Sequence, residues 1–219
     1  MPRLLFEKTG KAIWTSHLDL MRVFQRAFKR AALPLTHTHG YNPRPSVSIA
    51  LPLSVGVQSY CELLDFDLDG VTVSPADIQN RLNEALIEGV RVLDVYDEGR
   101  KLKHLALLSC KVYLQYDAGV GQETLDALRE LFSREALVVP KKGKNGIVDQ
   151  DLIPMIRSLD IVLEDEHRVC LNALICCQNP TLNPGQLVAA VELYLPQLCP
   201  DHSQCCRIEL FDTEGNIFR

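Results

Sequence analysis

The sequence predicts an α+β fold of two tandem ferredoxin-like units, each with the element order β-α-β-β-α-β and an antiparallel sheet that carries its helices on one face. Two observations lead to this prediction. Apolar residues follow the period of a strand and then that of a helix in this order, and they do so twice. The length of 219 residues suits two hydrophobic cores. With the joint in residues 97–107, we expect one unit over residues 1–100 and a second over residues 108–219.

Start and stop signals bound the elements of the first unit. Ser16 precedes a helical stripe of apolar residues and can accept a hydrogen bond from the amide near Asp19, and Leu33-Pro34 ends that helix. Ser74, followed by proline, marks the start of a second helix. In order, the expected elements are a strand over 3–8, a helix over 16–33, extended segments over 35–39 and 47–51, a strand over 61–68, a helix over 74–85 and a strand over 90–95.

The second unit follows the same order of periods without repeating the sequence. Pro154 confines its middle helix to about two turns. In order, the expected elements are a strand over 110–116, a helix over 122–135, a hairpin that turns at Lys144-Asn145-Gly146, a short helix within 151–159, strands over 161–163 and 169–175, a helix from Asn183-Pro184, and a closing strand over 207–211.

Composition excludes several classes of protein. With 47% hydrophobic and 23% charged residues, the chain is neither disordered nor fibrous. It has no run of roughly 18 apolar residues, and its first apolar stretch is too short for a secretory signal. We therefore expect a cytoplasmic protein without membrane contact, whose 8 Cys stay reduced.

Charge is distributed unevenly along the chain. The net charge is −5, yet residues 1–50 hold eight Lys and Arg against two Asp and Glu, and residues 51–100 hold three against ten. On a helical wheel, four cations of the first helix lie within about 100° of one another and opposite its apolar stripe. They are Arg22, Arg26, Lys29 and Arg30. Such a ridge can track the phosphates of a nucleic acid, and the alternative is an ordinary solvated helix face.

The segment from His37 to Ser48 concentrates aromatic and cationic residues in a turn rich in Gly and Pro. Tyr41 offers a ring for stacking, Arg44 offers a bidentate guanidinium, and Asn42 is expected to shape the loop. This mixture suits single-stranded or looped RNA, whose bases are splayed out and stacked on aromatic groups. The alternative is a wide turn between two strands.

Three histidines open a catalytic alternative. His17 falls in the first turn of the predicted helix, on its apolar side and near Trp14, while His37 and His39 lie in the loop. A general base and a general acid can cleave RNA at a 2′-hydroxyl without a metal. This hypothesis is an endoribonuclease with His17 as base and His37 or His39 as acid, and the competing interpretation is that these histidines are structural.

The N-terminal part of the chain resembles a bacterial family. The motifs that carry the resemblance are Phe6-Glu7-Lys8-Thr9-Gly10, Ser16-His17-Leu18-Asp19-Leu20-Met21-Arg22, Gly40-Tyr41-Asn42-Pro43 and Leu51-Pro52-Leu53-Ser54-Val55-Gly56-Val57. Over residues 3 to about 66, the chain is similar to a family of radical-SAM-associated proteins of unknown function, which are fused to, or encoded beside, radical-SAM proteins. By this resemblance, the motif positions are held by His17, Asp19, Arg22, Arg26, Arg30, Asn42 and Ser54. The resemblance implies a radical-SAM protein as partner and attaches no activity to the chain.

Common cofactor motifs are missing from the sequence. The thiolates that hold the cluster of a radical-SAM enzyme are usually spaced Cys-x3-Cys-x2-Cys, and this spacing does not occur. The last five cysteines also lack the Cys-x2-Cys knuckle of zinc sites. They are Cys176, Cys177, Cys199, Cys205 and Cys206. We expect no cofactor and no metal, with Asp65, Asp67 and Asp69 as an alternative site for a divalent cation.

These observations lead to one primary hypothesis and two alternatives. The primary hypothesis is a radical-SAM-associated accessory protein that has no catalytic activity alone and binds tRNA or rRNA for a radical-SAM partner. The first alternative is the metal-independent endoribonuclease. The second is a scaffold that docks the radical-SAM enzyme through the acidic second half and makes no contact with RNA.

Overall fold

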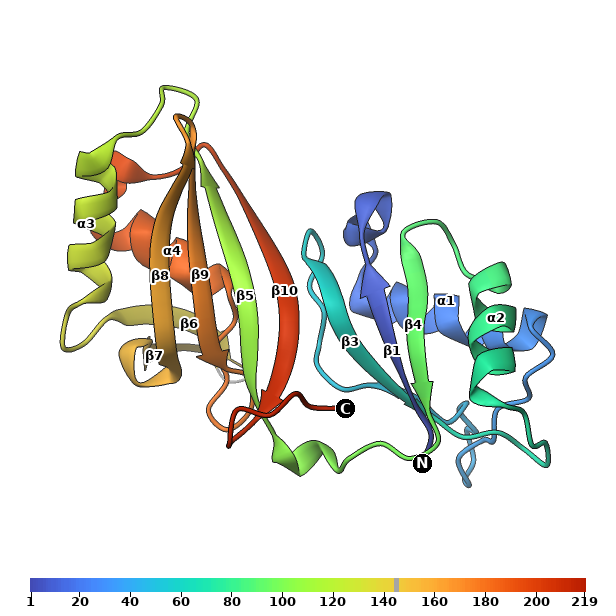
Figure 1. Cartoon of the computed structure of the whole chain (residues 1–219). Helices are drawn as coiled ribbons and strands as arrows, with labels where there is room; N and C mark the ends of the chain where they lie inside the picture. The colour runs from blue at the N-terminus through green and yellow to red at the C-terminus, as the bar shows by residue number, and fades with distance from the viewer. Residues whose placement is uncertain (144–145) are drawn as a thin grey trace. The chain divides into compact units, whose positions relative to one another are not determined.

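The computed structural model describes residues 1–143 and 146–219, and these residues form a mixed α+β fold with four α-helices and antiparallel sheet (Figure 1). The chain divides into two compact units. Unit 1 contains residues 1–104 and 217–219, and unit 2 contains residues 105–216. In the described part, no helix is both long enough and apolar enough to cross a lipid bilayer.

Unit 1 has one sheet with the strand order β4-β1-β3-β2, in which each neighbouring pair is antiparallel. Its elements are β1 (Arg3–Lys8), η1 (Gly10–Trp14), α1 (His17–Arg30), β2 (Val47–Ile49), β3 (Gln58–Phe66), α2 (Pro75–Ala85), β4 (Val90–Tyr96) and η2 (Leu102–His104). Side chains of both helices share one buried cluster with side chains of β1, β3 and β4. The helices therefore cover the same face of the sheet.

Aromatic pairs anchor α1 to this sheet. Phe24 meets Phe6 of β1 edge to face with ring centroids 4.7 Å apart, and the centroid of Phe28 lies 5.1 Å from that of Phe66 in β3. Burying one such side chain stabilises the fold by roughly 1.5–3 kcal/mol relative to leaving it exposed. The buried stripe of α1 that contains Phe24 and Phe28 therefore determines which face of the helix points to solvent.

Unit 2 has one sheet with the strand order β10-β5-β9-β8, again with antiparallel neighbours. Its elements are β5 (Leu105–Gln115), α3 (Gln122–Phe132), β6 (Val138–Gly143), β7 (Gly146–Asp151), η3 (Ile153–Met155), β8 (Ile156–Asp165), β9 (Arg168–Cys176), α4 (Gly185–Tyr194), η4 (Pro196–Leu198) and β10 (His202–Asp212). Strands β6 and β7 pair only with each other among the described residues. Unit 2 thus repeats the order of elements in unit 1, with this hairpin inserted after α3.

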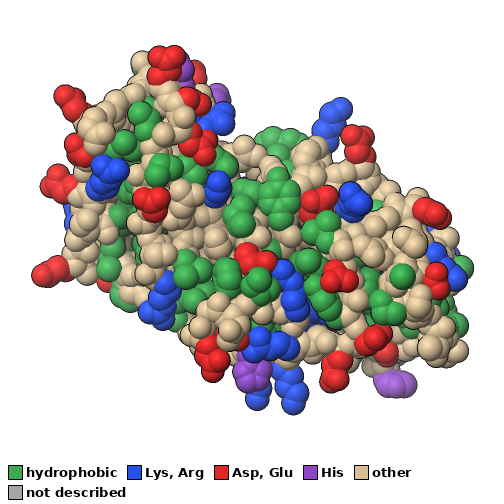
Figure 2. Space-filling view, in the orientation of Figure 1, with side chains coloured by type: hydrophobic (Ala, Val, Ile, Leu, Met, Phe, Trp, Pro, Cys, Tyr) green, Lys and Arg blue, Asp and Glu red, His purple; other side chains and the backbone are tan. Residues whose placement is uncertain are grey.

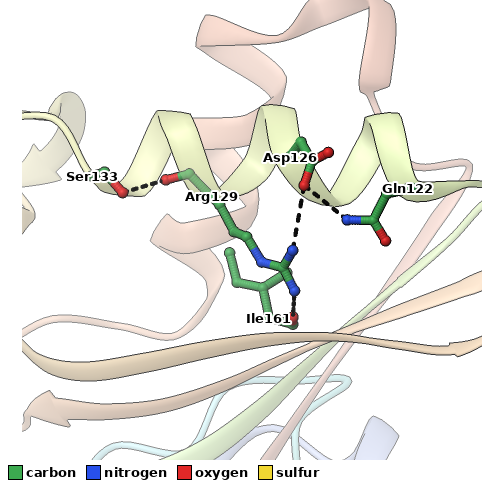
Figure 3. Close-up of polar contacts among 5 residues, drawn as sticks. All are labelled: Gln122, Asp126, Arg129, Ser133 and Ile161. Atoms are coloured by element: carbon green, nitrogen blue, oxygen red, sulfur yellow. Dashed lines mark hydrogen bonds and ion pairs between the residues drawn. The ribbon is translucent and has the colours of Figure 1, made fainter.

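Polar contacts tie α3 to the sheet of unit 2 (Figure 3). Arg129 donates one hydrogen bond to the backbone carbonyl of Ile161 in β8 at 3.1 Å and another to Asp126 at 3.4 Å. Gln122 also donates to the Asp126 carboxylate, at 2.8 Å, and the hydroxyl of Ser133 donates to the Arg129 carbonyl. The Arg129 guanidinium is therefore engaged in hydrogen bonds within unit 2.

The predicted helix within 151–159 is wrong. The chain makes a single 3-10 turn at Ile153–Met155, and β8 then begins at Ile156, five residues before the strand predicted from Ile161. Pro154 lacks the backbone N–H that a helix needs, and β8 pairs with the next strand, β9, from Ile156 to Asp165, so sheet pairing outweighs the local helical preference. Lys144 and Asn145 of the predicted hairpin turn lie outside the described residues.

The segment predicted as extended over 35–39 forms no strand of the sheet. Leu35 makes an isolated bridge to Leu68, and His37 makes one to Pro45. The alternating run over 47–51 supplies only the three residues of β2. This part of unit 1 is a loop held by a few backbone contacts, and it carries most of the residues considered next.

Candidate nucleic-acid interface

Helix α1 begins as the sequence predicts. The hydroxyl oxygen of Ser16 accepts a hydrogen bond from the amide of Asp19 at 3.2 Å, which satisfies one of the free amides of the first turn. The buried residues of the helix face the sheet, so the opposite face is left to solvent. That outward face carries the four predicted cations, all of them exposed: Arg22, Arg26, Lys29 and Arg30.

Two of these cations are engaged inside unit 1. Arg22 donates to the Asp19 carboxylate at 2.8 Å, and both side chains are more than half exposed, so solvent screens this pair and it adds little stability. Arg30 donates to the carbonyl of Ala85, the last residue of α2. Arg30 therefore caps the C-terminus of α2 and is less available to a ligand than the helical wheel implies.

Arg26 and Lys29 have no such engagement. In the part of the chain that the structure describes, neither side chain makes a hydrogen bond or an ion pair. Both side chains are exposed to an external anion, and the charge of Arg26 also contributes to the lowered pKa of Asp19.

Asp19 is the one acid on this helix. Its carboxylate accepts a hydrogen bond from the Ser16 hydroxyl at 2.7 Å and another from Arg22. These two bonds, with that from Ser16 the stronger influence, lower the pKa of Asp19 below its ordinary value. Asp19 is ionised at neutral pH and offsets one of the four cations.

The positive excess of residues 1–50 is smaller at the surface than the sequence predicts. Arg3 is 2% exposed and binds Asp65 through hydrogen bonds of 2.6 and 3.0 Å, and Lys8 is 0% exposed and donates to the carbonyls of Thr15 and Ser54. Both lie on β1, which is covered because it runs between β3 and β4. The other six cations of this block are exposed. Figure 2 shows basic and acidic side chains interspersed over the face in view.

The loop after α1 is a narrow hairpin from Thr36 to Ser46. The amide of Thr38 donates to the carbonyl of Arg44 at 2.9 Å, the amide of Arg44 donates back to the Thr38 hydroxyl at 3.0 Å, and the amide of Ser46 donates to the Thr36 carbonyl at 2.8 Å. The loop is thus braced along its length. At its tip, Tyr41 is fully exposed.

The remaining predicted residues of the loop are also exposed. They are His37, His39, Asn42 and Arg44. The hydroxyl of Thr36 donates to the Asp67 carboxylate at 3.0 Å, which fastens the base of the loop just beyond β3. A tyrosine presented on a braced loop loses little conformational freedom when a base stacks on it.

Helix α1 and the loop meet at a cavity of about 430 Å³. Lys29 of the helix and His37 of the loop both line it, and Asp69 lies at the same cavity. The other lining residues are Gln25, Phe28, Leu33, Pro34, Leu35 and Pro45. The basic face of α1 and the loop, which the sequence analysis considered separately, therefore line the same cavity.

His17 lies away from this cavity. It is the first residue of α1, and its Nδ1 atom is buried without a hydrogen-bond partner among the described residues. His37 lies beside Lys29, twelve residues along the helix, which corresponds to about 18 Å at 1.5 Å per residue. His17 and His37 therefore do not share a site, and a base and acid pair formed by these two side chains has no geometric support.

Trp14 occupies the surface near the start of α1. It is 70% exposed, and a side chain at Gly56 would lie 3.6 Å from its ring. The amide of Gly56 donates to the Ile13 carbonyl at 2.8 Å, so the segment around Gly56 packs beside η1. The buried amine of Lys8 also joins these two segments through Thr15 and Ser54.

The three aspartates considered as a cation site do not act together. Asp65 is held by Arg3, Asp67 accepts from Thr36, and Asp69 lines the cavity beside Lys29. Over residues 1–143 and 146–219, no group of three or more His, Cys, Asp or Glu side chains is placed to hold a metal ion. The sequence did not predict that Asp69 and Gln25 line the cavity. Residue 69 approaches the loop because Leu35 pairs with Leu68, a contact between segments far apart in the chain.

The cysteines are mostly buried thiols. Burial raises the pKa of Cys110 to about 12 and that of Cys170, Cys205 and Cys206 to about 11. The thiolate is the nucleophilic form, and a raised pKa keeps these four thiols protonated at neutral pH. Cys199 is exposed.

Comparison with known proteins identifies a family and little beyond it. No curated protein matches the sequence. A solved structure, the crystal structure of an unknown protein from Galdieria sulphuraria, aligns over 97% of this chain and 97% of its own, with 9% sequence identity and a TM-score of 0.26. A family model described as "Uncharacterized protein conserved in bacteria (DUF2344)" matches residues 2–184. The chain belongs to this uncharacterized bacterial family, DUF2344.

Proposed function

We propose that this protein binds RNA through the outward face of α1 and the 36–46 loop, as an accessory to a radical-SAM enzyme. One observation carries the proposal: Lys29 from the basic face and His37 from the loop line the same cavity. Phosphate-contacting cations and groups that stack on bases therefore adjoin each other, as recognition of unpaired RNA requires.

We assign different roles to the predicted residues, with their contacts inside unit 1 as support. Arg26 and Lys29, which are exposed and make no hydrogen bond or ion pair within the described chain, track phosphates. Tyr41 stacks on a base because its whole ring is exposed, and Arg44 clamps the backbone beside it. Arg22 and Arg30 contribute less, because Asp19 and the C-terminus of α2 already hold them. Asn42 shapes the tip of the loop.

We also assign the ferredoxin-like topology to each unit. The support is the order of elements together with the strand orders β4-β1-β3-β2 and β10-β5-β9-β8, which place the first and third strands of each unit side by side. This topology leaves the outward face of the first helix free for a ligand, since its other face is buried against the sheet.

The test is RNA binding as a function of salt concentration. Affinity for a fluorescent single-stranded RNA is measured by anisotropy for the full chain and for Arg26→Ala/Lys29→Ala. We expect the logarithm of affinity to fall with the logarithm of salt concentration, and the double variant to flatten this slope by about 1.4, because each of the two lost phosphate contacts on a single strand removes about 0.7.

A matched control removes the same charge elsewhere in unit 1. Arg91 on β4 and Lys103 on η2 are exposed cations outside the proposed surface, so Arg91→Ala/Lys103→Ala should keep the wild-type slope. Absent binding, binding that ignores salt, or equal slopes in the two double variants would overturn the proposal. Running the assay in EDTA and checking RNA length on a gel also tests the endoribonuclease alternative, since intact RNA excludes it.

The radical-SAM partner rests on the resemblance of residues 3–66 to proteins fused to, or encoded beside, such enzymes. The acidic second half is the surface we assign to that partner, because unit 2 holds 9 Lys and Arg against 16 Asp and Glu. Co-expression of the full chain with a neighbouring radical-SAM protein, followed by affinity purification, tests this part. A radical-SAM protein that never co-purifies, with the full chain folded and binding RNA, would reject the partner and leave RNA binding in place.

A further inference from the structure

The cavity between α1 and the 36–46 loop has the size and lining of a ligand site. Its volume of about 430 Å³ falls within the range of roughly 300–1,000 Å³ found for small-molecule sites. Phe28, Leu33 and Leu35 are buried core residues and supply apolar walls. Polar groups of opposite charge, Lys29 and Asp69, are placed at the same cavity.

Asp69 is held at this cavity by the backbone. Its amide donates to the carbonyl of Pro34 at 2.9 Å, next to the bridge between Leu35 and Leu68. Within residues 1–143 and 146–219, its carboxylate has neither a hydrogen bond nor an ion pair. Asp69 is exposed, so this carboxylate is open to a ligand that donates hydrogen bonds, beside a surface otherwise suited to a polyanion.

We propose that this cavity receives the guanine base of an unpaired RNA nucleotide, an inference that rests on the proposed RNA-binding function. The Watson–Crick edge of guanine presents two adjacent donors, N1–H and N2–H, which match the two oxygens of one carboxylate. Its O6 and N7 atoms are acceptors and match the ammonium of Lys29. Guanine can therefore hydrogen-bond to Asp69 and to Lys29 at the same time.

The other three bases match the Asp69 carboxylate less well. Adenine and cytosine each offer a carboxylate one exocyclic amino donor, flanked by a ring acceptor that would repel it, and uracil offers a single ring donor between two carbonyls. The apolar walls accept any base, so they supply affinity without choosing among the four. Selectivity among the bases therefore depends on Asp69. On the loop side of the cavity, His37 and Pro45 provide surfaces on which the base can stack.

The experiment compares four labelled RNA octamers that differ in one central base. The sequences are U8 and the same strand with G, A or C at its centre, measured by anisotropy at one salt concentration with the full chain. We expect the G octamer to bind about tenfold more tightly than the others, because only guanine makes a bidentate contact with the Asp69 carboxylate. Asp69→Asn should reduce this preference to less than about threefold while it leaves binding to U8 unchanged or slightly tighter, because a negative charge is removed.

Asp97→Asn is the matched control, since it removes one exposed acid of unit 1 outside the cavity. It should keep the preference for G. Titration of the full chain with guanosine 5′-monophosphate, followed by NMR of the His37 imidazole, gives a second readout that does not depend on the loop variants folding. Shifts with guanosine monophosphate and not with uridine monophosphate would support the site.

Failure of this inference can be told from failure of RNA binding. Equal affinity for the four octamers, with the salt slope still carried by Arg26 and Lys29, would overturn the guanine site and leave the proposed function standing. A G preference that survives Asp69→Asn would also overturn it. Absence of binding to every octamer would reject both.

Discussion

The first helices of the two units, α1 and α3, hold the same place in the order of elements and differ in what they turn to solvent. Both bury a stripe of large apolar side chains against their own sheet. The outward face of α1 carries four cations and one acid, whereas that of α3 carries three acids and one Arg that bonds to β8. The acids of α3 are Glu123, Asp126 and Glu130.

This contrast separates the buried stripe of each helix, which the fold requires, from the solvent face, which is free for function. The buried stripe is required in both units, because each helix must cover its sheet. The solvent face is not constrained in this way, so α1 and α3 can carry different charges there without loss of the fold. The segments that follow the two helices differ as well: α1 leads into the braced loop with Tyr41, and α3 leads into the β6–β7 hairpin.

The largest expected effect tests the shared part of this comparison. Phe28→Ala in α1 and Leu128→Ala in α3 each remove a fully buried side chain, and each should lower the free energy of unfolding by about 2–5 kcal/mol. Urea denaturation followed by circular dichroism measures this. Leu18→Ala, at a position 68% exposed on α1, is the control and should change stability by less than about 0.5 kcal/mol. A tolerated Phe28→Ala would show that α1 is not anchored as the aromatic pairs indicate.

The next effect tests the charged faces. Arg26→Glu/Lys29→Glu on α1 should weaken RNA binding by about 100-fold at low salt, because two attractive phosphate contacts become repulsive. The opposite change on α3, Glu123→Lys/Glu130→Lys, should alter affinity only a few-fold. Anisotropy with one labelled RNA measures both. If the two reversals shift affinity by similar factors in opposite directions, net charge and not the α1 surface governs binding.

A smaller effect tests the helix starts. Ser16 caps α1 through its hydroxyl, so Ser16→Ala should cost about 1 kcal/mol. Helix α3 begins after Gly121, which provides no side-chain cap and has open space where a side chain would extend, so Gly121→Ser should add a few tenths of a kcal/mol. Thermal unfolding of both variants measures the difference. A loss of stability in Gly121→Ser would contradict the interpretation that α3 merely lacks a cap.

The smallest effect concerns the acid of α1. Because the pKa of Asp19 is lowered in the folded state, its bonds stabilise the fold above the ordinary carboxyl pKa and are lost as pH falls through the lowered value. Asp19→Asn should therefore be less stable than wild type at pH 6 and approach wild type near pH 2. Urea midpoints at the two pH values check this. A stability difference that does not change with pH would rule out the Ser16 and Arg22 bonds as its cause.

Local patterns in the sequence predicted much of unit 1. The strand over 3–8, both N-caps and the separation of apolar from basic faces on α1 are confirmed, because each depends on neighbours within one turn or one strand. The wrong helix within 151–159 has the opposite origin, since pairing with β9 decided that segment. The cations of β1 were misjudged for a similar reason: Arg3 finds Asp65 from 62 residues away, and no local pattern marks that contact.

Periodicity and turn chemistry act over a few residues, so they are enough to predict which side of α1 is buried, where that helix starts, and which residue types the loop presents. Which of those residues share a site depends on contacts between distant parts of the chain. The tertiary structure brought Lys29, His37 and Asp69 to one cavity and left His17 at the other end of the helix. It also buried Lys8 and Arg3, because the strand that carries them became the centre of a sheet whose neighbours come from distant parts of the chain.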